Sequence, residues 1–152
     1  MKFFAVIRHG NHDDDGRIDD VGRRQMSRLA GLLEPHLEGH HVRFLVSPAP
    51  RATDSAEVLM KELGRREDYK SSDRLWCDDD HPENVDDALE LLLEESTGVD
   101  VLVVVTHAEY AALLPTEFAK ASFGARGSIF PMDVEKGRGR IIDCDRKVAV
   151  FL

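Results

Sequence analysis

Four apolar runs, interrupted only by Arg43, decide which kinds of fold this chain can adopt. They cover residues 3–7, 42–46, 101–105 and 148–152, and β-branched and aromatic side chains dominate them. A strand with one face in water alternates apolar and polar residues, whereas an unbroken apolar run suits a strand that is covered on both faces. The runs therefore predict a central sheet buried between other layers.

Helical periodicity fills the segments between these runs. Apolar residues recur every three or four positions over residues 26–37, 52–63, 85–92 and about 108–123. We expect the last of these helices to be interrupted or restarted at Pro115. We expect the third helix to start near Pro82, and we expect Asp80 or a neighbouring residue to cap the N-terminus of this helix.

The remaining strands define the fold class. A weaker strand is expected over residues 69–75, and the chain should end in a short antiparallel meander formed by residues 128–134, 139–143 and 148–152. Because strands alternate with helices, we predict an α/β three-layer sandwich with a mainly parallel central sheet and helices on both faces. A chain of 152 residues without a linker-like stretch should form a single domain over residues 1–152.

Composition excludes several classes of partner. A formal net charge of −9 argues against binding nucleic acid by broad phosphate neutralisation. The apolar runs are too short to span a membrane, and the five apolar residues before Arg8 are too short for a signal-peptide core. Cys77 and Cys144 have no metal-finger spacing, and we expect free thiols in a cytoplasmic protein.

Charged residues follow the buried strands directly. The first strand ends in Arg8 and His9, Arg51 follows the second, and His107 follows the run at 101–105. In parallel sheets the carboxyl ends of the strands share one edge, where ligands bind. Two arginine forks suit an oxyanion such as phosphate, and two imidazoles can act as nucleophile, base or hydrogen-bond donor.

Two neighbouring positions suit the same anion. Gly10 lets the backbone approach a ligand closely, and the helix that starts at Ala108 offers free N–H groups. The sequence therefore predicts a phosphate-binding pocket at this edge of the sheet, with a nucleophile inside the pocket.

Four motifs in this order resemble those of a known family. "RHG" at 8–10 is similar to the signature of the histidine phosphatase superfamily, which has the phosphoglycerate mutase-like fold. "IDDVG" at 18–22, "SPAPRATDSAEVL" at 47–59 and "VVVTHAEY" at 103–110 extend the likeness over most of the chain. The small size and "HPENVDDALELL" at 81–92 most resemble the short SixA-type phosphohistidine phosphatases.

The resemblance implies a two-step transfer without a metal or cofactor. His9 would attack phosphorus and hold the phosphoryl group, which water would then remove. Arg8, Arg51 and His107 would grip the non-bridging oxygens as charge builds on them. Asn11 would add a further donor to the substrate.

The family's proton-donating glutamate is missing from its expected place, where Leu75 is followed by Trp76 and Cys77. An alcohol leaving group needs a proton from the enzyme, whereas the nitrogen of a phosphoramidate can already carry one before cleavage. The missing acid therefore favours phosphohistidine over sugar phosphates. Carboxylates that could substitute for the missing one are Asp78, Asp79, Asp80 and Glu83, and also Asp13 to Asp15 on the first loop; the sequence does not single out one of them.

Other interpretations of these residues stay open at this point. Arg8 and His9 could form a structural pair with nearby aspartates. Residues 11–22 also resemble a calcium loop, but Gly22 stands where the bidentate glutamate belongs. The remaining histidines have no partners at recognisable metal-ligand spacing, so we expect no metal.

We therefore expect a phosphatase that acts through a covalent phosphohistidine intermediate. Its substrate would be a phosphorylated protein, favoured as a histidine-phosphorylated signalling protein, or a small phosphate ester. The alternatives are a small-molecule phosphomonoesterase and a non-catalytic module that binds phosphate or phosphoprotein. The sequence leaves the oligomeric state open.

Overall fold

The computed structural model describes residues 1–65, 68–124 and 132–152. Within these residues, six strands form one sheet in the order β3-β2-β4-β1-β5-β6. Strands β1, β2, β3 and β4 run parallel, and β5 and β6 extend the sheet in antiparallel fashion beside β1. The strand bounds are β1 Phe3–Arg8, β2 Val42–Val46, β3 Lys70–Ser71, β4 Val101–Thr106, β5 Gly139–Asp143 and β6 Val148–Phe151.

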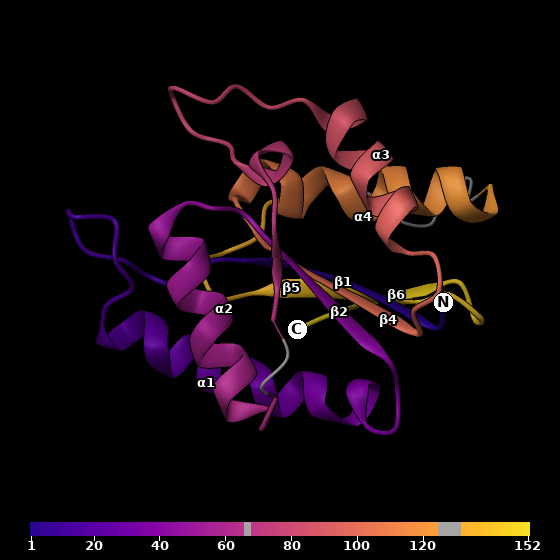
Figure 1. Cartoon of the computed structure of the whole chain (residues 1–152), viewed down its shortest axis with the longest axis horizontal. Coiled ribbons are helices and arrows are strands. Elements are labelled where there is room, and N and C mark those ends of the chain that lie inside the picture. The colour runs from indigo at the N-terminus through magenta and orange to yellow at the C-terminus, as the bar shows by residue number, and fades with distance from the viewer. Residues whose placement is uncertain (66–67, 125–131) are drawn as a thin grey trace.

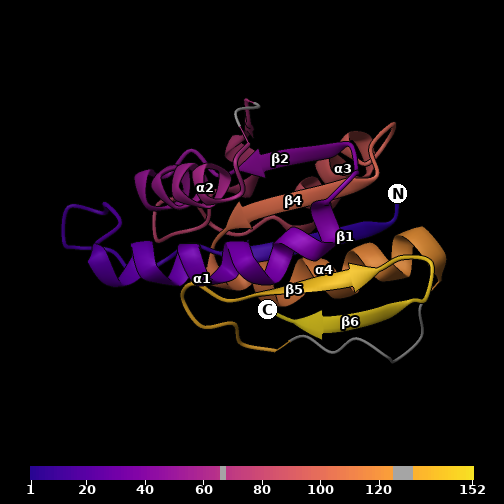
Figure 2. The same ribbon diagram turned by 90° about the horizontal axis from the view of Figure 1, so that it is seen from below.

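Helices cover both faces of this sheet, which confirms the predicted three-layer α/β sandwich (Figures 1 and 2). The helices α1 and α2 lie on one face, and α3 and α4 lie on the other. The helix bounds are α1 Asp20–Leu37, α2 Pro50–Glu62, α3 Val85–Glu95 and α4 Ala108–Phe123. None of the described helices is both long enough and apolar enough to cross a bilayer.

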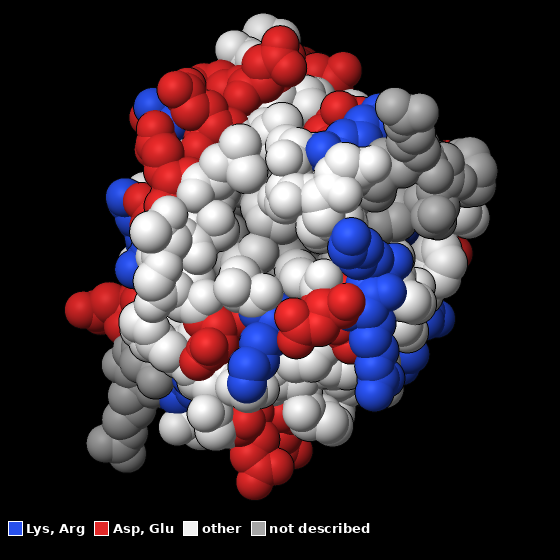
Figure 3. All heavy atoms as spheres, turned by 90° about the vertical axis from the view of Figure 1, so that its right-hand side faces the viewer, with Lys and Arg blue, Asp and Glu red and all other residues white. Residues whose placement is uncertain are grey.

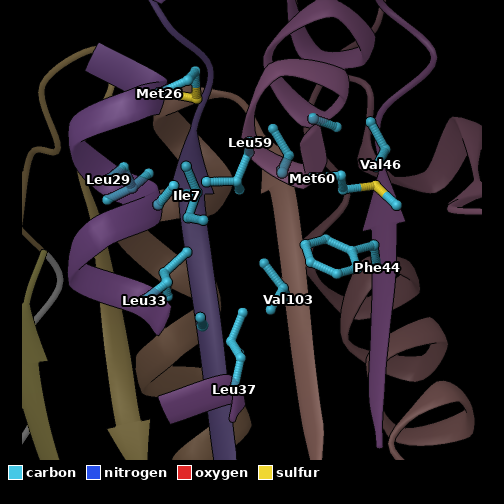
Figure 4. Close-up of a cluster of buried hydrophobic side chains, with 14 of the residues drawn as sticks. Ile7, Met26, Leu29, Leu33, Leu37, Phe44, Val46, Leu59, Met60 and Val103 are labelled. Carbon is cyan, nitrogen blue, oxygen red and sulfur yellow. The ribbon is translucent and has the colours of Figure 1, made fainter. Parts of the chain in front are cut away.

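Four strands, β1, β2, β4 and β5, contribute side chains to two cores. Alternate residues of β1 point to opposite faces, so Ala5 and Ile7 pack with α1 and α2, whereas Phe4 and Val6 pack with α3 and α4. In the first core, Ile7 lies between Leu29 of α1 and Leu59 of α2 (Figure 4). Burial on both faces is the physical reason that β1 and β4 read as unbroken apolar runs.

Much of the acidic charge lies away from the carboxyl ends of the parallel strands. Figure 3 views the end of the molecule where β1 begins, and acidic side chains gather near the top of that face, where α3 lies. The exposed residues Asp86, Glu90 and Glu94 belong to this helix. The net negative charge of the chain is therefore compatible with a cationic pocket at the other end.

Five local expectations need correction or qualification. The apolar run at 148–152 forms β6 but is not covered on both faces, because Val148, Val150 and Phe151 are exposed on this edge strand. Residues 69–75 are the two-residue strand β3 followed by a 3₁₀ turn, Asp73–Leu75, because the Ser72 side chain caps that turn. α4 runs through Pro115 without a restart. The cap of α3 is Asn84 rather than Asp80, and Pro82 precedes this cap. Of the strand expected at 128–134, residues 128–131 lie outside the described residues and 132–134 are not a strand.

Candidate active site

The carboxyl edge of the parallel strands carries a pocket of about 440 Å³. The four predicted catalytic residues line it together, although β1, α2 and the turn after β4 contribute them separately. Four further segments complete the wall, namely the loop after β1, the turn after the 3₁₀ helix, the first turn of α4 and the segment before β5. The lining residues are Arg8, His9, His12, Arg51, Cys77, Asp78, Asp79, His107, Ala108, Glu109 and Lys136.

The hydrogen bonds of His9 determine which ring nitrogen is free. Its Nδ1 lies 2.9 Å from the carbonyl oxygen of Gly10, which can only accept, so Nδ1 carries the proton. Its Nε2 therefore has a lone pair, which accepts a hydrogen bond from Arg51 Nε at 3.2 Å. Burial, assisted by the charges of the neighbouring imidazoles and Arg51, lowers the pKa of His9 to about 3. At neutral pH, His9 is an uncharged imidazole with its reactive nitrogen in the pocket.

The hydrogen bonds of His107 also fix its protonation, but here Nε2 carries the proton and Nδ1 is the free nitrogen. Its Nδ1 accepts from Arg51 Nη2 at 3.3 Å, so its Nε2 carries the proton and donates to Ser47 Oγ at 2.8 Å. Burial and then the charge of Arg51 lower the pKa of His107 to about 3. The ring centroids of His9 and His107 lie 5.4 Å apart, with Arg51 bonded to both rings. The negative charge of a bound phosphate would counteract the charge of Arg51 and would therefore raise the pKa of His107.

The second guanidinium is positioned from a different element. Arg8 Nη1 donates to the carbonyl oxygen of Val134 at 2.8 Å. Its Nε is buried and has no hydrogen-bond partner among the described residues. A buried donor without an acceptor is unfavourable, and an oxyanion in the pocket would supply the acceptor. Arg8, Arg51 and the N-terminus of α4 at Ala108 thus provide positive potential around the reactive nitrogen of His9.

Gly10 and Asn11, expected to hold substrate, have other partners. The amide of Gly10 donates to Ser55 Oγ at 2.9 Å, and the Asn11 side chain donates to Asp19. Neither residue is among those that line the pocket in the described part of the chain. Both instead join the first loop to α1 and α2, which keeps His9 in place, because Ser55 also donates to the carbonyl oxygen of Arg51.

The aspartates of the first loop have structural partners too. Asp13 Oδ1 accepts from the amides of Asp15 and Arg17, which closes a tight turn. Arg17 donates twice to Asp54 of α2, and Asp19 caps α1. Over residues 1–65, 68–124 and 132–152, no group of three or more His, Cys, Asp or Glu side chains is arranged to hold a metal ion.

Asp78 lies close to Arg51 but is unsuited to donate a proton. Its carboxylate accepts from Trp76 Nε1 at 2.6 Å and from His81 Nδ1 at 2.7 Å, and it lies 3.9 Å from Arg51 Nη2. Desolvation works in the opposite direction, but the hydrogen bonds from His81, Trp76 and the Asp80 amide outweigh it and lower the pKa of Asp78 to about 2. Asp78 is therefore an ionised acceptor at neutral pH.

The other candidate proton donors differ in whether they line the pocket. Asp79 lines the pocket, whereas Asp80 and Glu83 are not among its described lining residues. Trp76 stacks on the His81 ring at a centroid distance of 4.0 Å, behind Asp78, so it packs there and does not form a pocket wall.

Four lining residues were not expected from the sequence, namely His12, Cys77, Glu109 and Lys136. Glu109 could have been found, because a side chain in the first turn of a helix that begins at the site is bound to lie near it. His12 and Lys136 carry no such signal, since their loops have no regular geometry.

No protein-family model matches the chain, and no curated protein matches its sequence. Solved structures do match. The protein histidine phosphatase SixA complexed with tungstate superposes over 99% of this chain and 94% of its own, with a TM-score of 0.71 and 18% identity. This chain has the histidine phosphatase fold.

Two further structures support the same fold. A putative phosphohistidine phosphatase SixA from Agrobacterium tumefaciens matches over 99% of this chain and 97% of its own, with a TM-score of 0.66 and 16% identity. A putative alpha-ribazole-5'-P phosphatase from Escherichia coli K-12 matches over 99% and 94%, with a TM-score of 0.66 and 18% identity. The resemblance inferred from the motifs is thus confirmed for the histidine phosphatase fold over nearly the whole chain.

Proposed function

We propose that this protein is a phosphatase that uses His9 as its nucleophile. The observation that carries the proposal is the state of the His9 ring, whose unprotonated Nε2 lies in the pocket 3.2 Å from Arg51 Nε. The low pKa of about 3 keeps this nitrogen unprotonated over the neutral range. An imidazole in this state, flanked by two arginines, suits attack on a tetrahedral phosphorus centre.

The reaction follows from these positions in two steps. The lone pair of His9 Nε2 forms a bond to phosphorus while the bond to the leaving group breaks, and that electron pair departs with the leaving atom. Arg8 and Arg51 stabilise the charge on the non-bridging oxygens, and His107 joins them once the bound anion has raised its pKa. Water then attacks phosphorus, and the electron pair of the P–N bond returns to His9 with release of phosphate.

We propose phosphohistidine on a protein as the preferred substrate. Beyond the cationic base of the pocket, the carboxylates of Asp78, Asp79 and Glu109 outnumber the ammonium group of Lys136. This negative rim disfavours anionic leaving groups and favours a basic nitrogen. Two of the similar structures are described as the protein histidine phosphatase SixA and a putative phosphohistidine phosphatase SixA, which agrees with this choice.

A small-molecule phosphomonoesterase is the second candidate. The observation that favours it is that Asp79 and Glu109 line the pocket, so a carboxyl group is available to protonate an alcohol. The similarity to a putative alpha-ribazole-5'-P phosphatase points the same way.

The test measures phosphate release from a phosphohistidine peptide, glycerol phosphate and p-nitrophenyl phosphate. We expect turnover of the phosphohistidine peptide, unaffected by a chelator, and loss of turnover in His9→Ala. His36→Ala is the matched control, because His36 lies in the last turn of α1 outside the pocket lining. Equal release by His9→Ala and the wild type would rule out the proposed chemistry. Turnover of glycerol phosphate without turnover of phosphohistidine would favour the second candidate.

A further inference from the structure

Glu109 is held at the pocket by rigid neighbours on both sides in sequence. It belongs to the first turn of α4, two residues after His107, whose ring is bonded to Ser47. The next residue, Tyr110, is buried, and its hydroxyl accepts from the amide of Asn84 at 2.9 Å. Since His107 and Tyr110 are both fixed, the backbone of Glu109 has little freedom, and its side chain lines the pocket from a regular helix rather than from a loop.

A buried thiol lines the pocket together with Glu109. Cys77 is buried and lies in the same wall. Burial and then the negative charge of Glu109 raise the pKa of Cys77 to about 11, so the thiol keeps its proton at neutral pH. The Glu109 carboxylate therefore faces a neutral neighbour, and its lone pairs are available to a ligand.

Glu109 is also better placed than the other rim carboxylates to meet a leaving group. Asp78 is committed to Trp76 and His81. Asp79 and Glu109 are both exposed, but Asp79 lies in the short turn between Asp78 and His81. Glu109 alone among the three lies on a helix that starts at the phosphate-binding end of the pocket.

We propose that Glu109 accepts a hydrogen bond from the protonated ring of a phosphohistidine substrate, and so determines specificity for a nitrogen leaving group. This inference rests on the proposed function. When one ring nitrogen carries the phosphoryl group and the other carries a proton, cleavage of the P–N bond returns an electron pair to the ring and leaves a neutral imidazole. The Glu109 carboxylate binds the N–H of that second nitrogen and favours the protonated, more labile form. No proton has to pass from enzyme to substrate in this step.

The sharpest variant is Glu109→Gln, because glutamine has nearly the same size and keeps one accepting oxygen but loses the negative charge. The readout is the ratio of kcat/KM for a phosphohistidine peptide to kcat/KM for p-nitrophenyl phosphate, whose leaving group needs neither a proton nor a carboxylate. We expect this ratio to fall roughly 10-fold, as for the loss of one charge-assisted hydrogen bond. Glu117→Gln is the control, because Glu117 lies on the same helix but pairs with Lys120 outside the pocket.

The outcomes separate this inference from the function it rests on. A ratio that falls in Glu109→Gln and stays at the wild-type value in Glu117→Gln supports the inference. An unchanged or increased ratio in Glu109→Gln overturns it, and so does a larger loss with glycerol phosphate than with phosphohistidine, which would make Glu109 a proton donor for alcohols. If the wild type fails to hydrolyse the phosphohistidine peptide, the proposed substrate is wrong and the specificity role is wrong with it.

Discussion

Acid should destabilise this protein through the two imidazoles that form its site. His9 and His107 have pKa values of about 3 in the folded state, against the ordinary value of 6.5 that they regain on unfolding. The unfolded chain therefore binds protons that the folded protein does not, so the free energy of unfolding falls as the pH drops from 6.5 towards 3. Above pH 6.5 the stability contributed by the neutral rings is fully present.

The magnitude follows from these two pKa values. Between pH 7 and pH 5, each imidazole should lower the free energy of unfolding by about 2 kcal/mol, and the pair by about 4 kcal/mol. A typical domain has a stability of roughly 5–15 kcal/mol, so the effect is large enough to measure. The lowered pKa of Asp78 contributes in a separate window, because its effect is lost only as the pH falls from 3.8 to about 2.

Urea unfolding followed by circular dichroism, at pH 7 and pH 5 in phosphate-free buffer, tests this prediction. The comparison is with the double variant His9→Asn/His107→Asn, in which all other titrating groups remain. We expect the double variant to lose about 4 kcal/mol less stability than the wild type on acidification, and each single variant to lie half-way. If wild type and double variant lose the same stability, the two rings are not held neutral by burial, and the assignment of His9 as a ready nucleophile would be refuted.

Three further predictions concern the supports of the site. Arg51→Ala should lower kcat for p-nitrophenyl phosphate by roughly 10²–10³-fold, because Arg51 bonds both imidazoles and faces the anion, and steady-state kinetics would show a smaller loss if Arg51 were only structural. Ser55→Ala should reduce the free energy of unfolding by about 1–3 kcal/mol, measured in urea, because the amide of Gly10 loses its acceptor in a buried site. Gly22→Ala should destabilise by about 1–3 kcal/mol, because the new Cβ would meet a backbone oxygen at 2.1 Å. Gly31→Ala is its control on the same helix, where nothing lies within 4 Å, and thermal unfolding should show unchanged or slightly raised stability.

The local failures of prediction have a common cause. Pro115 lies inside a continuous helix because tertiary packing of α4 on the sheet outweighs the local cost of a proline. The segment at 69–75 has strand-like composition, but only Lys70 and Ser71 pair with β2 before the capped 3₁₀ turn begins. Propensity is a property of neighbours in sequence, whereas these outcomes depend on partners far along the chain.

The sequence alone was sufficient for the architecture and for the four residues at the centre of the pocket. Unbroken apolar runs predict strands covered on both faces, and in a parallel sheet the residues that follow such strands must share one edge, so Arg8, His9, Arg51 and His107 could be placed together. Periodicity and strand direction are local or topological properties, which is why they can be read without coordinates.

Only the tertiary structure decided the chemical state of those residues and the use of their neighbours. The carbonyl oxygen of Gly10 sets the free nitrogen of His9, whereas Arg51, which lies 42 positions from His9 and 56 from His107 in sequence, donates to both rings and sets the free nitrogen of His107. The amide of Gly10 is bonded to Ser55, Asp78 is held ionised by Trp76 and His81, and Glu109 lies on the pocket wall. Protonation and hydrogen bonding depend on distances of a few ångströms between segments, and the order of residues along the chain does not contain those distances.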